Sequence, residues 1–242
     1  MASAQPEQDS NTQLKQLIKN QARFKQRSHD THNRTHRPQL NEHSSSTSAE
    51  LLPQIDIVLL GDSMFGRFKT TGRQTQIGQL RYPRLFNAGV GGDRIENVLY
   101  RVDLGLLDLL KPHNPKLVVL HLGTNNLRPR QGLTRQQLDD YYLLLQALLL
   151  ILSSDAQILI VGLFKRTDIE DQYIVQSNMA LEELVTKINM EQDHRVHWMD
   201  SSSSIGWGHL DDHVHFSVNG YRIWDAALYP KIQNLLSVSN SK

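Results

Sequence analysis

The sequence predicts an α/β fold in which a five-stranded parallel sheet lies between two layers of helices. From residue 51 onward, apolar runs of strand length alternate with longer helical patterns, which is typical of a parallel sheet covered by helices. Leu117–Leu120 is apolar at every position, as expected for a strand that is buried on both faces. Residues 51–242 are also numerous enough to form one large hydrophobic core.

Five strands are expected from short apolar runs that are bounded by turn-forming residues. In chain order they are Ile55–Leu60, Arg84–Ala88, Lys116–Leu122, Gln157–Leu163 and Arg195–Met199. Because helical patterns separate these runs, the connections cross over the sheet and the strands run parallel.

Four helices are expected between and after the strands, at Asp93–Leu110, Thr134–Leu152, Gln172–Met190 and Ser217–Leu236. The first opens with an acidic residue, repeats apolar residues at helical spacing and stops before Pro112. The last begins at Ser217, a residue type that caps helix N-termini. Within the second helix, Tyr141–Leu152 is apolar nearly all round, which predicts burial on several sides or a contact in a homodimer, and we favour burial.

The first fifty residues differ from the rest of the chain. They hold seven Lys or Arg, five Asp or Glu and many Gln, Asn, Ser and Thr, but few large apolar residues. Such a segment buries too little surface to offset the entropy of ordering. We therefore expect residues 1–50 to form a disordered polar arm, with a linker at Ser44–Ser48, and residues 51–242 to form the folded domain. An apolar stripe from Leu14 to Phe24 admits a helix that binds an unknown partner or a membrane, but its shortness favours a solvated tail.

Composition excludes several classes of function. The chain has no cysteine, which rules out disulfides, thiolate metal sites and a cysteine nucleophile. Residues 51–242 are close to electrically neutral, which argues against nucleic-acid binding. No apolar run reaches the length of about 20 residues that a membrane span needs, and the first ten residues lack the pattern of a secretory signal. An intracellular, cytoplasmic protein without a transmembrane segment is expected.

The first candidate site residue is Ser63, in the sequence Gly61-Asp62-Ser63-Met64 directly after the first expected strand. In an open α/β sheet, ligands bind beyond the carboxyl ends of the strands, and a serine there can present its hydroxyl as a nucleophile. The alternative is a serine that only caps the next helix. The sequence does not match the Gly-x-Ser-x-Gly elbow, because Phe65 occupies the second glycine position.

The second candidate lies in residues 211–217, before the last expected helix. A serine nucleophile needs a base, and a histidine base needs a carboxylate on its other ring nitrogen. Asp212 and His215 are three residues apart, and in a turn this spacing can bring the two groups together, with Asp211 as an alternative carboxylate. A polar capping loop or a metal site from Asp211, Asp212, His213 and His215 competes with this interpretation. No further cluster of ligands accompanies these residues, so we expect no metal.

Two further segments follow expected strands. The side-chain amide of Asn125, in Gly123-Thr124-Asn125-Asn126, could donate a hydrogen bond to a developing oxyanion, although Asn is also common in turns. A backbone N–H of Gly89-Val90-Gly91-Gly92-Asp93 could serve the same oxygen. The second segment does not match a dinucleotide-binding fingerprint, because position 94 is Arg, so we expect no cofactor.

The order of these four segments resembles the sequence blocks of the SGNH (GDSL-type) hydrolases. Gly61-Asp62-Ser63, the glycine of Gly91-Gly92-Asp93, Gly123-Thr124-Asn125-Asn126 and Asp212-His213-Val214-His215 match those blocks in order. Within the superfamily, Asn87–Asp93 and the run into Asn126 are most similar to the catalytic subunits of intracellular platelet-activating-factor acetylhydrolase. The resemblance covers about residues 55 to 236 and implies a flavodoxin-like three-layer fold with a five-stranded parallel sheet.

The resemblance implies a catalytic triad and an oxyanion hole. The triad would consist of Ser63 as nucleophile, His215 as base and Asp212 as orienting carboxylate. The oxyanion donors would be the backbone N–H groups of Ser63 and Gly92 and the side chain of Asn125, with Gly91 as an alternative to Gly92. Asn126 stands where most members have Asp, as in the acetylhydrolase branch, which affects a supporting residue only.

The function that the resemblance implies is a serine esterase that hydrolyses short-chain acyl or acetyl esters through an acyl-enzyme. Its substrate would be a small-molecule or lipid ester. A carbohydrate-ester deacetylase with the same machinery is an alternative. A second is a non-catalytic protein that uses the fold to bind a partner.

Overall fold

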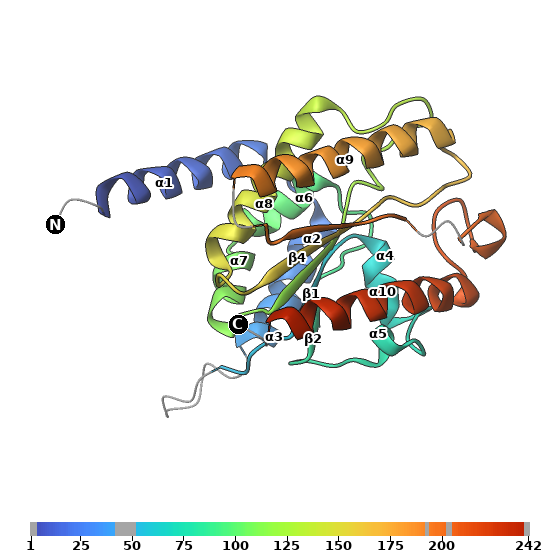
Figure 1. The fold of residues 1–242 in the computed structure, drawn as a ribbon, viewed down its shortest axis with the longest axis horizontal. Coiled ribbons are helices and arrows are strands. Elements are labelled where there is room, and N and C mark those ends of the chain that lie inside the picture. Colours follow the sequence, from blue (N-terminus) through green and yellow to red (C-terminus); the bar gives the residue numbers. More distant parts are fainter. Residues whose placement is uncertain (1–3, 42–51, 192–193, 202–204, 240–242) are drawn as a thin grey trace.

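A five-stranded parallel sheet forms the centre of the computed structural model, which describes residues 4–41, 52–191, 194–201 and 205–239 (Figure 1). The strands are β1 (Ile57–Gly61), β2 (Leu85–Asn87), β3 (Leu117–His121), β4 (Gln157–Val161) and β5 (Val196–Met199). They pair in the order β2-β1-β3-β4-β5, and each pair is parallel. This is the flavodoxin-like strand order, so the predicted fold class is confirmed.

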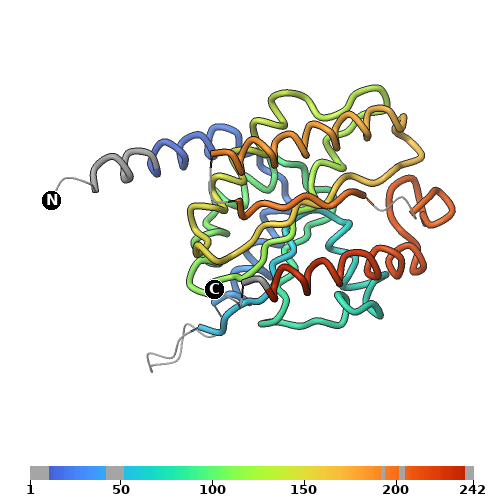
Figure 2. Tube along the Cα trace, in the orientation of Figure 1, coloured from blue at the N-terminus to red at the C-terminus, as the bar shows by residue number. Residues whose placement is uncertain are grey.

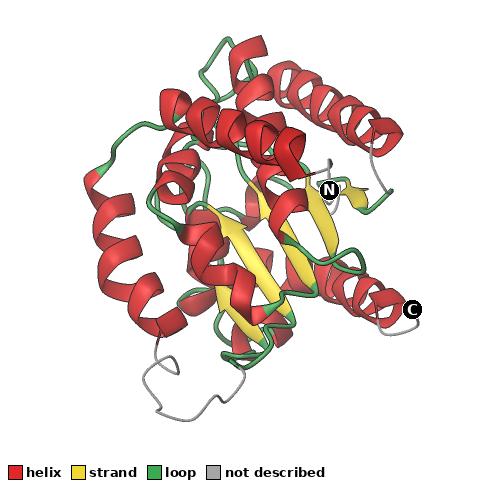
Figure 3. Cartoon of the chain, turned by 90° about the vertical axis from the view of Figure 1, so that its left-hand side faces the viewer, coloured by secondary structure: helices red, strands yellow, loops and turns green. Residues whose placement is uncertain are grey.

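Two layers of helices cover the sheet (Figure 3). Val58 and Leu60 of β1 face a core that is closed by α6, α7, α8 and α9. Ile57 and Leu59, the alternate positions, face a second core under α4, α5 and α10. Each strand is therefore apolar at consecutive positions because each of its faces is buried. The helices of these layers are α4 (Ser63–Gly66), α5 (Gln76–Gln79), α6 (Ile95–Asp103), α7 (Leu106–Leu110), α8 (Arg135–Ile151), α9 (Asp171–Glu191) and α10 (Val218–Ser239).

The helix expected at Asp93–Leu110 is divided into α6 and α7. Leu104 ends α6, and Gly105 follows with a φ of +92°, a conformation that glycine adopts without strain. The separation lets α7 turn to pack against α3 (Arg37–Asn41) and α8. The helical periodicity continued across Gly105, so the sequence pattern did not reveal the break.

The prediction of a disordered arm is wrong for residues 4–41, which form α1 (Ala4–Gln21), α2 (Gln26–Thr31), the π-helix η1 (His32–His36) and α3 (Arg37–Asn41). We call residues 4–41 the N-terminal segment. Figure 2 shows the coloured part of this segment beside the part of the chain that contains α6, α7 and α8. The segment is attached to the domain through its few apolar side chains, since Ile18 and Leu40 are buried in the main core. Composition averaged over fifty residues concealed them. The predicted linker at Ser44–Ser48 lies outside the described residues.

Two other predictions concern burial and the membrane. Tyr141, Leu144, Leu145 and Leu148 of α8 are fully buried within this chain, in agreement with the burial expected for this apolar helix. In the parts of the chain that the structure describes, no helix combines the length and the apolar character that a membrane span requires.

Candidate active site

Ser63 begins α4 at the carboxyl end of β1. Asp62 caps this helix, since its carboxyl accepts a hydrogen bond of 2.8 Å from the N–H of Met64. Gly61 precedes the turn and packs against β3 so closely that a Cβ atom would lie 2.2 Å from the carbonyl oxygen of His121. The turn therefore requires glycine at position 61. The Ser63 hydroxyl lies beyond the carboxyl end of β1, which is an internal strand between β2 and β3.

His215 connects Ser63 to Asp212. Its Nε2 atom lies 2.9 Å from Ser63 Oγ, and its Nδ1 atom lies 2.7 Å from Asp212 Oδ2. The second carboxylate oxygen of Asp212 accepts backbone N–H groups of Val214, at 2.8 Å, and His215, at 2.7 Å. The carboxylate is thus fixed by its own turn while it orients the imidazole. Asp211, the alternative carboxylate, instead donates its backbone N–H to the carbonyl of His215.

The electrostatics of this turn keep Asp212 ionised. Burial alone would raise the pKa of Asp212, but hydrogen bonds from the His215 side chain and from two backbone N–H groups lower it well below its usual range. Arg67 adds a weaker ion pair, at 3.9 Å. An anionic carboxylate at this position favours a proton on Nδ1 of His215, which leaves Nε2 free to accept a proton from Ser63.

The predicted oxyanion donors come from the ends of three neighbouring strands. Asn125 follows β3, and its Nδ2 atom lies 2.9 Å from the carbonyl oxygen of Asp93 and 3.3 Å from Asp62 Oδ2. Asn125 thus touches the residue before Ser63 and the residue after Gly92. Gly92 has a φ of +75°. No acceptor among the described residues takes the backbone N–H of Ser63 or Gly92.

Asp62 is a fully buried acid beside the nucleophile. Burial raises its pKa to about 7, although the hydrogen bond from Met64 and the positive charge of Arg166 oppose the shift. The negative charge of Asp93 raises the pKa further. The Asp62 carboxyl therefore titrates near neutral pH. It shapes the turn through its hydrogen bond with Met64 and does not carry a permanent negative charge.

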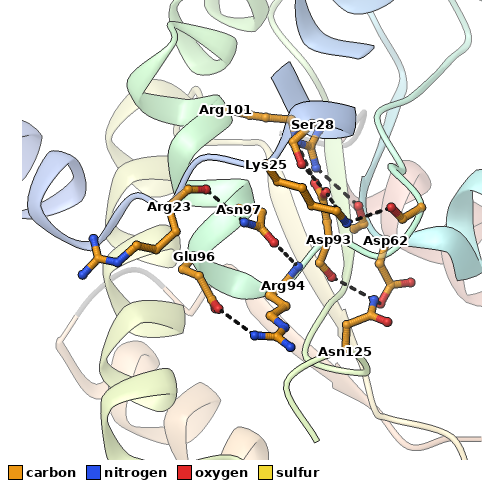
Figure 4. Close-up of polar contacts among 12 residues, drawn as sticks. Arg23, Lys25, Ser28, Asp62, Asp93, Arg94, Glu96, Asn97, Arg101 and Asn125 are labelled. Carbon is orange, nitrogen blue, oxygen red and sulfur yellow. Dashed lines mark hydrogen bonds and ion pairs between the residues drawn. The ribbon is translucent and has the colours of Figure 1, made fainter. Parts of the chain in front are cut away.

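The sequence-based prediction missed the buried ion pair that holds residues 89–92, which we call the glycine loop. Asp93 is fully buried and forms an ion pair of 3.0 Å with the equally buried Arg101. Arg101 also donates to the carbonyl oxygens of Ala88, at 2.8 Å, and Gly61, at 3.3 Å. Figure 4 shows Asp93 between Arg101 and Asn125. The spacing of Asp93 and Arg101, eight residues apart, places both on one helical face, but nothing in the sequence marks that face as buried.

The described residues contain no group of three or more His, Asp or Glu side chains that could hold a metal ion. His213, which the competing metal hypothesis required, is turned toward Asp168, with Nε2 4.0 Å from a carboxylate oxygen. A hydroxyl hydrogen-bonded to an imidazole, which is hydrogen-bonded in turn to a carboxylate, is an arrangement that can activate the hydroxyl for attack on an ester carbonyl.

The comparisons with known proteins agree with the fold. A carbohydrate esterase family 3 protein from Talaromyces cellulolyticus superposes with a TM-score of 0.54 at 17% identity, over 76% of this chain and 99% of that chain. Est24, a carbohydrate acetylesterase from Sinorhizobium meliloti, gives a TM-score of 0.54 at 14% identity, over 75% of this chain and 100% of that chain. At such identities the likeness establishes the shared fold.

The sequence comparisons define the class and the family. Platelet-activating factor acetylhydrolase IB subunit alpha1 of Bos taurus is 27% identical over 191 residues, which cover 75% of this chain and 77% of that protein. Residues 59–223 match the GDSL-like lipase/acylhydrolase family. The protein is a carboxylic ester hydrolase with an α/β fold. It belongs to the GDSL-like lipase/acylhydrolase family.

Proposed function

We propose that the protein is a serine esterase that hydrolyses short-chain esters, acetyl esters above all, through a covalent acyl-enzyme. The observation that carries this proposal is the position of His215, which lies within hydrogen-bond distance of both Ser63 Oγ, at 2.9 Å, and Asp212 Oδ2, at 2.7 Å. A binding protein has no need for such a chain of three groups. The relatives named acetylhydrolases support the acetyl group as the acyl portion.

The mechanism follows from the chemistry of these groups. His215 Nε2 removes the proton of Ser63 as Oγ attacks the ester carbonyl, and Asp212 stabilises the imidazolium that forms. The N–H groups of Ser63 and Gly92 donate to the oxyanion of the tetrahedral intermediate. The Asn125 amide donates to it as well, with the N–H that otherwise makes the long, 3.3 Å bond to Asp62. The C–O bond then breaks, and His215 returns its proton to the leaving alcohol. Water repeats these steps on the acyl-enzyme and releases the acid.

A depression near the loop that carries His215 offers room for a small alcohol portion. Its volume is about 480 Å³, and Arg166, Asp168 and Trp207 are among its lining residues. It borders the loop that carries His215, since Thr167 donates its backbone N–H to the carbonyl of His213. A cavity of this size suits a small ligand.

The test is hydrolysis of p-nitrophenyl acetate, butyrate and octanoate by the purified protein and by Ser63→Ala. We expect acetate to be the best substrate and Ser63→Ala to lose about 10⁶-fold in kcat. Ser237→Ala, which changes an exposed serine of α10, is the matched control and should retain full activity.

Each other result would contradict a defined part of the proposal. Hydrolysis by Ser63→Ala at the wild-type rate would exclude Ser63 as nucleophile. A preference for octanoate would exclude the short-chain specificity but leave the serine mechanism standing. If the wild-type protein hydrolysed none of the esters and a fluorophosphonate probe failed to label Ser63, the site would not be a serine esterase site.

A further inference from the structure

The N-terminal segment reaches the loop that carries the proposed oxyanion donor Gly92. Lys25 lies between α1 and α2, and its Nζ atom donates a hydrogen bond of 2.9 Å to the carbonyl oxygen of Gly91. The same ammonium lies 3.6 Å from Asp93 Oδ1. A Cβ atom on Gly92 would lie 2.7 Å from Lys25 Nζ, so the ammonium sits directly against the loop.

Peptide geometry links this contact to the oxyanion hole. The carbonyl of Gly91 and the N–H of Gly92 belong to one planar peptide unit, and in a trans peptide they point in opposite directions. A bond that fixes the Gly91 oxygen toward Lys25 therefore aims the Gly92 N–H away from Lys25. Hydrogen bonding at the carbonyl also polarises the peptide and makes its N–H a stronger donor.

Asp93 is the second connection between the N-terminal segment and the site. Ser28 Oγ of α2 donates a 2.5 Å hydrogen bond to Asp93 Oδ1, and Arg101 pairs with the other carboxylate oxygen. The backbone carbonyl of Asp93 accepts the side-chain amide of Asn125. Figure 4 shows Lys25 and Ser28 gathered at Asp93 together with Asn125. Two of the three proposed oxyanion donors, Gly92 and Asn125, are thus next to Asp93 in the chain or hydrogen-bonded to it. Asp93 is in turn bonded to the N-terminal segment.

Burial makes this attachment specific. Ser28 and Asp93 are fully buried, and the Lys25 side chain is 29% exposed. The chain before Lys25 is fixed independently by the backbone of Arg23. The Arg23 N–H donates to the carbonyl oxygen of Glu96, and the Arg23 carbonyl oxygen accepts from the side-chain amide of Asn97 at the start of α6. The backbone around Lys25 is therefore held in place, and the Lys25 side chain contacts the glycine loop from a fixed position.

We propose that Lys25 is a positioning residue of the active site, which orients the Gly91–Gly92 peptide for oxyanion binding, with Ser28 as a second anchor through Asp93. The N-terminal segment is thereby part of the catalytic unit. This inference rests on the proposed function, since it assigns a role in the oxyanion hole of the Ser63 reaction.

The test compares Lys25→Met with wild type on p-nitrophenyl acetate. Methionine fills similar space but cannot donate to the Gly91 carbonyl. We expect kcat to fall about 10- to 100-fold, less than the loss of a whole donor, while KM changes less than about twofold. The Ki of a boronic acid that forms a tetrahedral adduct on Ser63 should rise in parallel with the loss of kcat. Lys25→Arg, which restores a cationic donor, should recover most of kcat.

Lys69→Met is the matched control. Lys69 Nζ also donates to a backbone carbonyl, that of Asn87, at 3.1 Å. The N–H of the same peptide, on Ala88, is already bonded to Leu59 within the sheet, so it is no oxyanion donor. Lys69→Met should keep the wild-type kcat and Ki. If Lys25→Met does not fold, Ser28→Ala carries the test, with a smaller fall in kcat at constant KM.

The results separate this inference from the proposed function. Wild-type kcat and boronate Ki in a folded Lys25→Met protein, or in Ser28→Ala where it replaces that variant, would overturn the positioning role alone. An equal loss in Lys69→Met would do the same, since it would reveal a general effect of removing a lysine. Full activity of Ser63→Ala would overturn the proposed function and this inference together.

Discussion

The imidazole of His215 lies 2.9 Å from the hydroxyl of Ser63, although 152 residues separate the two in the chain. The carboxyl end of β1 supplies Ser63, and the loop before α10 supplies His215. That loop is fixed by packing, since Phe216 is fully buried and meets Trp224 edge-on at 5.6 Å between ring centroids. The distance between nucleophile and base is therefore a property of the whole fold.

Replacing Asp212 tests the orientation of this base. In Asp212→Asn the backbone N–H groups of Val214 and His215 keep an acceptor, but the negative charge that holds His215 in the required tautomer is lost. We expect kcat for p-nitrophenyl acetate to fall by about 10⁴-fold with little change in melting temperature. Asp211→Asn is the matched control one residue earlier. An equal loss in that control would show that the wrong carboxylate has been assigned.

Asn125→Ala tests the oxyanion hole. Loss of the side-chain amide should lower kcat by about 10²–10³-fold, with KM nearly constant, because the donor acts on the transition state. The comparison is Asn126→Ala, whose side chain accepts from the N–H of Ile95 and donates to Glu96. That variant should lose on the order of 1 kcal/mol of stability and retain more of its kcat. A large KM effect in Asn125→Ala would point to ground-state binding instead.

Two glycines with positive φ allow backbone strain to be separated from catalysis. Gly92 has a φ of +75° and would carry a Cβ against Lys25, whereas Gly105 has a φ of +92° and open space around it. Alanine at either position should cost about 1–2 kcal/mol of stability. Only Gly92→Ala should also lower kcat, because it disturbs the loop that holds the proposed donor. Equal kcat values in both variants, measured well below their melting temperatures, would remove Gly92 from the site.

The central sheet and the candidate site could be predicted because both depend on local patterns. Strands such as β3 are continuous apolar runs, and parallel strands bring their carboxyl ends to one edge. Ser63 and Asn125 follow two such strands directly. The spacing of Asp212 and His215 adds the third element, so their proximity is encoded within four residues.

The N-terminal segment could not be predicted in the same way. Its attachment depends on Lys25 and Ser28, whose partners lie 66 and 65 residues further along the chain. Neither residue belongs to an apolar pattern, and the surrounding composition is typical of disorder. The burial of Arg101 is likewise invisible from periodicity, because only the position of Asp93 in the fold makes a charged residue favourable there.

The raised pKa of Asp62 leads us to expect an unusual dependence of stability on pH. Its pKa is about 7 in the fold because of burial, above the usual value of an unfolded Asp near 4. Between these values the folded protein binds a proton that the unfolded chain does not. The Asp62 contribution therefore weakens the fold as pH rises from about 4 to about 7, by on the order of 4 kcal/mol.

Asp62→Asn should remove this slope. Relative to wild type, the free energy of unfolding of Asp62→Asn, measured by urea titration, should become larger as pH rises from 4.5 to 7.5, because only wild type loses stability. The exposed Asp108→Asn on α7 is the matched control and should follow wild type. A constant difference between Asp62→Asn and wild type across this range would show that Asp62 is ionised throughout.

The buried side chain of His36 leads us to expect the opposite pH dependence, a loss of stability as pH falls. It is fully buried against Phe86, with ring centroids 5.4 Å apart, and neither ring nitrogen has a hydrogen-bond partner among the described residues. Burial lowers its pKa to about 2, and the charges of Arg101 and Lys69 add to the shift. The unfolded chain takes up a proton near pH 6.5, whereas the folded chain does not. Stability is therefore lost as pH falls below about 6.5, by roughly 1.4 kcal/mol per pH unit.

His36→Phe should keep the aromatic contact and abolish this proton uptake. Its stability measured by urea unfolding should fall less than that of wild type between pH 6.5 and 4.5, and the difference between the two proteins should become constant above pH 7. His194→Asn is the control, because His194 is exposed and has a φ of +54°, which Asn tolerates. If wild type and His36→Phe lost stability in parallel on acidification, the N-terminal segment would not hold His36 as a buried, neutral group.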